Sequence, residues 1–217
     1  MAFVGVLMLQ TRFPRPLGDI GNPLTFEALR IPARHLVVPG ASAQRVVRHS
    51  DAALLADFSA AALQLVREGA SMISTSCGFL ALFQQQLQQA VPVPVLSSSL
   101  LWLPRLGPTA GVLSIDALAL TPAHLAAVAA APATPIGGVA TGCEFQRRIL
   151  GDDPQLDPQQ ACADVVAGAQ SLLAQHPGIG TIVLECSNMV PYAAAVTAAT
   201  GRPVEHIISL IEATWMH

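Results

Sequence analysis

Residues 72–80 read MISTSCGFL, and residues 181–189 read TIVLECSNM. Each stretch begins with an apolar run typical of a buried strand, which leads to a cysteine and then to a segment with the pattern of a helix. Cys77 and Cys186 therefore occupy equivalent positions, at the end of a strand and the start of a helix. This repetition predicts the same local structure in both halves of the chain.

The match between the halves extends beyond the cysteines. Gly5 and Gly111 lie in matching apolar runs, and the intervals from them to Cys77 and Cys186 are 72 and 75 positions. A Pro-Val pair follows each cysteine after the same interval of seventeen positions (77 to 94 and 186 to 203). Agreement in order and spacing predicts a duplicated architecture with two lobes related by a pseudo-two-fold axis.

Short apolar runs alternate with longer alanine-rich segments of helical period, a pattern typical of α/β proteins with mainly parallel sheets. Helices are expected to begin at Ser50, Thr121 and Asp157, the last two followed by a first-turn proline, and Gly69 is expected to end the first. The expected strands are 3–9, 35–38, 71–75, 93–96, 111–115, 136–140, 181–184 and 203–206. The sequence therefore predicts an α/β fold with a mainly parallel, four-stranded sheet in each lobe.

The repeat also predicts where the lobes divide. The first lobe is expected to span residues 1–105 and to be joined by a C-terminal helix over 207–217, while the second spans residues 106–206. Ligands of α/β proteins bind outside the carboxyl ends of the parallel strands. Both cysteines should therefore open onto one cleft between the lobes.

The composition argues against several classes of protein. The chain has 217 residues, of which 52% are hydrophobic, and its formal net charge is −3. This charge balance gives no basic surface of the kind that binds nucleic acid or an anionic membrane. All 11 basic residues are arginine, so the chain has no lysine for a Schiff base or for a Walker-type phosphate loop.

Signals for targeting and for metal binding are weak. Residues 1–9 are apolar but lack a basic flank and a cleavage site, and no apolar stretch approaches the roughly 18 to 20 residues that span a bilayer. The 4 cysteines form no CxxC pair, and the 6 histidines form no HxH or HExxH motif. We therefore expect a cytoplasmic protein with reduced thiols, no metal and no cofactor.

A cysteine at the end of a strand has two interpretations. Taken alone, Cys77 or Cys186 is plainly interpreted as a small buried hydrophobe. At the start of a helix, however, unpaired backbone amides stabilise a thiolate and lower the pKa of the thiol. Two such thiols on opposite walls of a cleft fit the removal of a proton from one face of a carbon atom and its return from the other. The duplicated position therefore predicts Cys77 and Cys186 as the catalytic acid and base.

The segments around the cysteines also provide groups that bind a carboxylate. Backbone amides at the start of a helix favour anions, and each cysteine begins such a segment. The predicted substrate-binding residues are Ser76, Gly78, Phe79, Ser187 and Asn188, together with Gln10 and Thr11 after the first strand. For Gln10 and Thr11, a solvated loop is an equally good interpretation.

These motifs resemble those of the aspartate/glutamate racemase superfamily, which includes hydantoin racemases, arylmalonate decarboxylases and maleate isomerases. The resemblance spans nearly the whole chain and is carried by residues 74–80, residues 184–189 and the opening strands of both halves. It implies two flavodoxin-like lobes, cofactor-independent proton transfer at the Cα of an acidic or acyl substrate, and frequent dimers. It also implies that Cys77 and Cys186 are the acid and base.

The sequence departs from the better-known members at two places. Typical glutamate and aspartate racemases have a histidine or glutamate two positions after the second cysteine, where this chain has Asn188. Glutamate racemases also have an acidic residue just after the first strand, where this chain has Gln10 and Thr11. Activation of the cysteines would then depend on helix amides and on the hydroxyls of Ser76 and Ser187.

The leading hypothesis is a cofactor-independent racemase or epimerase of amino-acid metabolism. Its substrate is expected to be a small carboxylate such as aspartate, glutamate or a hydantoin, and a homodimer is the assembly to be considered. One alternative keeps the fold and uses a cysteine to isomerise a double bond or to protonate the product of a decarboxylation. Another is a non-catalytic protein that closes around a small acid. Analysis of the products, and of binding after replacement of both cysteines, distinguishes these alternatives.

Overall fold

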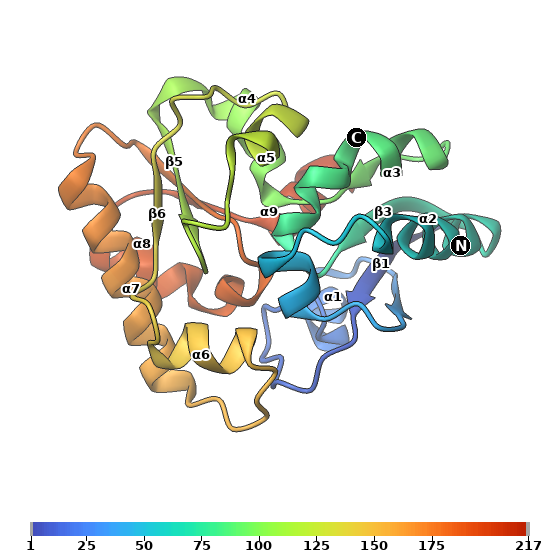
Figure 1. The fold of residues 1–217 in the computed structure, drawn as a ribbon, viewed down its shortest axis with the longest axis horizontal. Helices are drawn as coiled ribbons and strands as arrows, with labels where there is room; N and C mark the ends of the chain where they lie inside the picture. Colours follow the sequence, from blue (N-terminus) through green and yellow to red (C-terminus); the bar gives the residue numbers. More distant parts are fainter. Residues whose placement is uncertain (1, 216–217) are drawn as a thin grey trace.

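The computed structural model describes residues 2–215, which form two α/β lobes side by side (Figure 1). Each lobe contains a four-stranded sheet in which every pairing is parallel. The strand order is β2-β1-β3-β4 in the first sheet and β6-β5-β7-β8 in the second, so corresponding strands of the two halves occupy corresponding places. The expected α/β fold with duplicated lobes is confirmed.

All eight expected strands are present. Strands that are covered by helices on both faces are apolar along their whole length, and β1 and β5 are buried at every residue. This continuous burial explains why apolar runs in the sequence locate the strands. The strands are β1 (Phe3–Leu9), β2 (Ala33–Val38), β3 (Ala70–Thr75), β4 (Val95–Leu96), β5 (Ala110–Ser114), β6 (Ile136–Gly138), β7 (Thr181–Leu184) and β8 (Val204–Glu205).

The α-helices pack on both sides of the sheets, and short 3-10 or π-helical turns lead into several of them. The α-helices are α1 (Pro23–Leu29), α2 (Leu54–Arg67), α3 (Gln84–Ala90), α4 (Leu103–Leu106), α5 (Pro122–Ala127), α6 (Glu144–Leu150), α7 (Pro158–Gln175), α8 (Ala193–Thr200) and α9 (Ile207–Trp215). The π-helical turn is η1 (Gln44–Arg48), and the 3-10 turns are η2 (Gly78–Phe83), η3 (Ser99–Trp102), η4 (Gly107–Thr109) and η5 (Ser187–Tyr192). None of the helices in the described part of the chain is both long enough and apolar enough to cross a membrane.

Two of the three predicted helix starts are confirmed. Thr121 begins α5 with a capping box, and the Asp157 carboxylate accepts hydrogen bonds from backbone amides of the first turn of α7. The prediction of Ser50 as a helix cap is wrong. Its backbone is left-handed, with a φ of 45°, whereas an N-cap residue has an extended backbone, and α2 begins only at Leu54.

Both cysteines begin the same kind of turn. Cys77 follows β3 and precedes η2, which continues into α3. Cys186 follows β7 and precedes η5, which continues into α8. The first turn after each cysteine is therefore a 3-10 turn and not the α-helix that the sequence pattern suggests. The equivalence of the two halves is retained in this detail.

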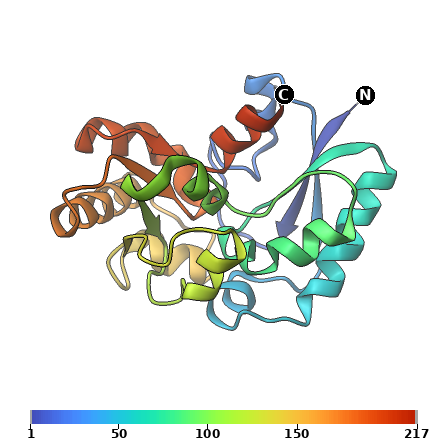
Figure 2. The same ribbon diagram turned by 90° about the horizontal axis from the view of Figure 1, so that it is seen from above.

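The C-terminal helix α9 packs against the sheet of the first lobe. Its apolar residues Ile207 and Ile211 belong to the same buried cluster as Val4 and Val6 of β1. Figure 2 shows α9, in red, beside the blue segments of the first lobe. The expected domain boundary at residue 105 falls in α4, and residues 216 and 217 of the expected C-terminal helix lie outside the described residues.

Candidate active site

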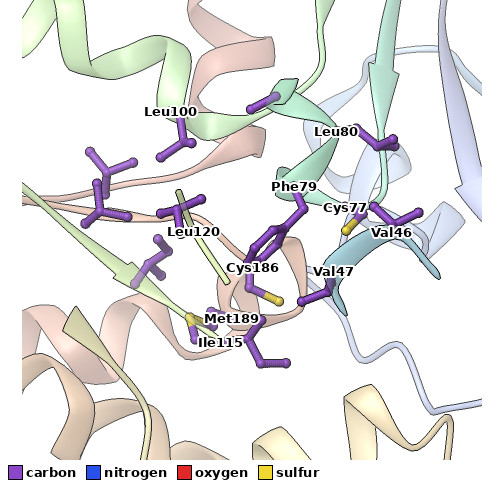
Figure 3. Packing of buried hydrophobic residues seen from close by; sticks show 14 of the residues in the cluster. Val46, Val47, Cys77, Phe79, Leu80, Leu100, Ile115, Leu120, Cys186 and Met189 are labelled. Carbon is purple, nitrogen blue, oxygen red and sulfur yellow. The ribbon is translucent and has the colours of Figure 1, made fainter. Parts of the chain in front are cut away.

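The carboxyl ends of β3 and β7 meet where the two lobes join. The Ser187 hydroxyl donates a hydrogen bond of 2.7 Å to the carbonyl oxygen of Ser76, and the Ser99 hydroxyl donates one of 2.6 Å to the carbonyl oxygen of Leu184. These buried hydrogen bonds join segments of different lobes. As a result, Cys77 and Cys186 lie in one cluster (Figure 3).

Both cysteines line one small cavity of about 20 Å³, which has room for about one water molecule. Its wall is mostly apolar and includes no lysine, arginine or histidine. The lining residues are Leu9, Phe13, Ala43, Val47, Ser76, Cys77, Gly78, Phe79, Ile115, Ile149, Leu150, Glu185, Cys186 and Asn188.

The cavity brings together most of the residues that the sequence predicts for the site. Six of them line it, namely Ser76, Cys77, Gly78, Phe79, Cys186 and Asn188. The other three are engaged outside the lining. Gln10 accepts a hydrogen bond from the Gly40 amide, Thr11 accepts one from Arg15, and the Ser187 hydroxyl binds the Ser76 carbonyl.

Cys77 has the helix-start environment that the sequence predicts, but its pKa moves in the opposite direction. Backbone amides of Phe79 and Leu80 donate to its sulfur and lower the pKa. Burial and the charge of Glu185 outweigh them and raise the pKa to about 12. The expectation of a lowered thiol pKa is therefore wrong for this cavity, because removal of the thiolate from water raises the pKa more than the backbone amides lower it.

Cys186 has a different set of neighbours. Its Sγ donates to Oδ1 of Asn188 at 3.6 Å, while Nδ2 of Asn188 donates to Asp19 at 2.6 Å. Asp19 is fully buried, and its other carboxylate oxygen pairs with Arg15 at 2.8 Å. Because the Asp19 carboxylate accepts only from the NH₂ end of the Asn188 side chain, it turns the oxygen of that amide toward Cys186. Burial, followed by the charges of Glu185 and Cys77, raises the pKa of Cys186 well above its usual value, and an acceptor next to the sulfur also favours the thiol.

Sequence reasoning assigned no role to two carboxylic acids of the site. Glu185 directly precedes Cys186 and is 1% exposed, and its Oε2 accepts a hydrogen bond of 2.9 Å from Ser114. Asp19 lies in the segment Gly18–Gly21, which has the sequence of a plain turn. An acidic residue at the end of an otherwise apolar strand was a visible signal for Glu185, whereas nothing near Asp19 in the sequence pointed to Asn188.

Two segments from different lobes contribute to the cavity wall. Val47 of η1 comes from the first lobe, and Ile149 of α6 comes from the second. Ion pairs join the same regions. Arg48 lies 2.7 Å from Asp116, and the Arg12 guanidinium lies 3.1 Å from the Asp152 carboxylate. Because the cavity has room for about one water molecule, entry of a larger molecule requires part of its wall to move.

In residues 2–215, no group of three or more histidine, cysteine, aspartate or glutamate side chains is arranged to hold a metal ion. The groups that this site offers for chemistry are two thiols, one buried carboxyl and the backbone amides of the two 3-10 turns.

Comparison with curated proteins gives related sequences along nearly the whole chain. A dimethylsulfoniopropionate lyase of Durusdinium sp. clade D is 30% identical over 216 residues, which cover 94% of this chain and 70% of the relative. Dimethylsulfoniopropionate lyase 3 of Emiliania huxleyi is 28% identical over 222 residues. The chain spans 56% of the length of that relative. No protein-family model matches the chain.

Solved structures share the fold at low sequence identity. A variant of arylmalonate decarboxylase has a TM-score of 0.61 at 16% identity, covering 93% of this chain and 86% of that chain. An allantoin racemase from Pseudomonas fluorescens has a TM-score of 0.58 at 15% identity, covering 95% and 86%. An aspartate racemase from Picrophilus torridus has a TM-score of 0.52 at 10% identity, covering 97% and 94%. The two-lobed architecture is that of racemases and decarboxylases.

Proposed function

Because the chain belongs to the dimethylsulfoniopropionate lyase family, within the aspartate/glutamate/hydantoin racemase superfamily, we propose that it is a lyase that expels a neutral sulfide from a small β-sulfonio carboxylate. Dimethylsulfoniopropionate is the substrate that the related lyases suggest. The single observation that carries the proposal is the pair of thiols, one from each lobe, on one cavity that no cationic side chain lines.

The reaction needs a base at the carbon next to the carboxylate. A thiolate removes the Cα proton, the electron pair forms the Cα–Cβ double bond, and the Cβ–S bond breaks. Dimethyl sulfide leaves with its electron pair, acrylate remains, and the proton passes from the thiol to solvent. Atoms and charges balance without an oxidant or a reductant.

The two thiols have unequal surroundings, which favours different roles for them. The sulfur of Cys77 receives two backbone N–H groups, which favour the thiolate. The sulfur of Cys186 receives one backbone N–H, that of Asn188, and also faces the side-chain oxygen of Asn188, which favours the thiol. Cys77 is therefore the base of the proposed reaction. Cys186 is the neutral thiol, which donates its hydrogen bond to Oδ1 of Asn188. Backbone amides of the 3-10 turns remain the proposed binding groups for the substrate carboxylate.

The raised pKa of Cys77 fits a cationic substrate. In the closed apolar cavity the thiolate is costly, because nothing on the wall carries positive charge. A bound sulfonium supplies that charge at the reacting centre and thereby lowers the pKa of the thiol. A base that ionises only beside its substrate is also protected from other electrophiles.

The apolar wall also favours elimination over inversion. In racemisation, negative charge builds up on the substrate and must be stabilised by groups of the site. In elimination, the same electron pair expels a neutral leaving group, so less charge accumulates. A site without cationic side chains is better suited to the second reaction.

A racemase is the second candidate, because two thiols from equivalent positions of the two lobes also fit proton transfer at two faces of one carbon. It predicts exchange of the Cα proton and inversion without loss of any group. Incubation of aspartate, glutamate and hydantoin enantiomers in deuterated water, followed by nuclear magnetic resonance, measures both.

The deciding experiment supplies dimethylsulfoniopropionate and measures dimethyl sulfide in the gas phase and acrylate in solution. The wild-type protein is expected to form both in equal amounts, and Cys77→Ser and Cys186→Ser are expected to form neither. Cys162→Ser is the matched control, since this thiol lies on α7 outside the cavity lining and its loss should leave the rate unchanged. Folded wild-type protein that forms no dimethyl sulfide would overturn the proposal.

A further inference from the structure

Glu185 is a buried carboxyl group that the proton transfer does not use. Glu185 lines the same cavity as Cys77 and Cys186, and it is 1% exposed. Oε2 accepts a hydrogen bond from Ser114, whereas Oε1 is buried and has no hydrogen-bond partner among the described residues. A buried acceptor without a partner is costly, so it indicates a group whose partner arrives with a ligand.

Gly78 shows on which side the unpartnered oxygen lies. A Cβ atom at Gly78 would lie 2.3 Å from Oε1 of Glu185, so a glycine is needed for the carboxyl group to reach this position. Gly78 directly follows Cys77 and itself lines the cavity. The oxygen therefore lies against the first residue of η2, which directly follows Cys77 in the chain.

The charged neighbours of this carboxyl group are all acidic or already paired. Asp116 and the two thiols surround Glu185, and Asp19 lies beyond Cys186. Asp116 is paired with Arg48, and Asp19 is paired with Arg15. Burial, opposed by the Ser114 hydrogen bond, raises the pKa of Glu185 to about 8. At neutral pH the group is therefore mostly a neutral acid, and a cation beside it would favour the carboxylate.

The rest of the wall indicates what kind of cation fits. Phe79, Ile115 and Val47 offer rings and methyl groups, and the site offers few further acceptors. An ammonium group has N–H donors that require several acceptors when buried. A sulfonium group has none and carries apolar methyl groups, so it needs only a negative charge and apolar or aromatic contacts.

We propose that Glu185 is the residue that selects a sulfonium substrate, by ionising as the counter-ion of the bound cation. This inference rests on the proposed function for the identity of the cation. It predicts that binding of the cation is coupled to loss of the Glu185 proton, which passes to the buffer, so that the sulfonium is shared by the Glu185 carboxylate and, during proton transfer, by the Cys77 thiolate. Selectivity would then come from a carboxyl group and not from the cysteines.

The test uses two ligands that cannot undergo the elimination. Dimethylsulfonioacetate and 3-methylbutanoate have the same shape, and differ in that a sulfonium sulfur replaces a neutral CH group. Wild-type protein is expected to bind the sulfonium compound at least roughly tenfold more tightly, and Glu185→Gln is expected to remove most of this preference. Binding of 3-methylbutanoate should be the same in both proteins, which reports that the variant retains its cavity. Glu27→Gln changes an exposed carboxyl group and serves as the matched control.

Calorimetry in two buffers of different ionisation enthalpy gives a second readout. At pH 7 the sulfonium compound should release close to one proton from wild-type protein, and close to none from Glu185→Gln. The neutral compound should release none from either protein. A merely structural role of Glu185 would change the affinity for both ligands alike and would not link binding to this proton.

The inference is overturned if Glu185→Gln keeps the wild-type preference, if the wild-type protein does not discriminate between the ligands, or if it binds neither of them. Its failure is distinguishable from failure of the proposed function. Release of dimethyl sulfide together with an unchanged preference in Glu185→Gln overturns the role of Glu185 alone. A preference that depends on Glu185, without any release of dimethyl sulfide, overturns the lyase reaction alone.

Discussion

Replacement of Gly78 by alanine tests whether the contact between η2 and Glu185 is as close as the structure indicates. The added Cβ would lie 2.1 Å from the backbone oxygen of Glu185 and 2.3 Å from its Oε1. Contacts this short do not occur between real Cβ and oxygen atoms, so one of the two segments must move. Because the nearer atom belongs to the backbone of the other lobe, rotation of a side chain cannot relieve the contact.

The size of the effect follows from the cost of overpacking. Insertion of a methyl group into a well-packed interior costs about 1–3 kcal/mol, and a contact with backbone belongs at the upper end, at about 3 kcal/mol. For a protein of this size, about 1 kcal/mol lowers the Tm by roughly 2–4 °C, so a fall of roughly 6–12 °C is expected. Equilibrium unfolding in urea, followed by circular dichroism, and differential scanning calorimetry measure these quantities.

Gly178→Ala is the control, because no atom lies within 4 Å of a Cβ at that position and its φ is not left-handed. It should change the free energy of unfolding by no more than about 0.5 kcal/mol. If Gly78→Ala unfolds within about 1 kcal/mol of Gly178→Ala, with the same dependence on urea, the close packing of η2 against Glu185 is refuted.

Three further predictions concern the core, the buried acid and the orientation of Asn188. Phe58→Ala removes a fully buried ring of α2 and should lower the free energy of unfolding by about 3–5 kcal/mol, whereas Leu118→Ala, at a side chain that is 95% exposed, should change it by less than about 0.5 kcal/mol. Urea unfolding measures both values, and equal values for the two variants would contradict the assigned core. Since burial raises the pKa of Glu185 to about 8, the unfolded chain releases this proton at a lower pH than the folded protein, and the Glu185 contribution to stability falls as the pH rises from about 5 to 8. Glu185→Gln should flatten this decline in the free energy of unfolding. If the free energy of unfolding depends on pH in the same way in both proteins, Glu185 ionises normally. Asp19→Asn frees the Asn188 amide to turn its NH₂ end toward Cys186, so the alkylation of Cys186 relative to that of Cys77 should increase at fixed pH. Mass spectrometry of the peptides measures this ratio, and an unchanged ratio would indicate that Asp19 does not set the orientation of the amide.

Location of the strands from the sequence succeeded because both faces of these sheets are covered. A strand buried on both faces is apolar at every position, as in β1, and such a run is visible without any knowledge of its neighbours. The start of α2 was misplaced for the opposite reason. The residues between η1 and α2 have a conformation set by packing, and the left-handed backbone of Ser50 has no signature in the sequence.

The sequence by itself determined the duplicated α/β architecture and the equivalence of Cys77 and Cys186, because apolar periodicity and spacing along one chain are local properties. Only the tertiary structure decided which groups surround the two thiols. Asp19 reaches Asn188 across 169 positions of the chain, and Glu185 lies against Gly78 of the other lobe. The direction of a pKa shift depends on burial and on all charges nearby in space, so helix amides that are local in sequence could not reveal that burial raises the pKa of both thiols.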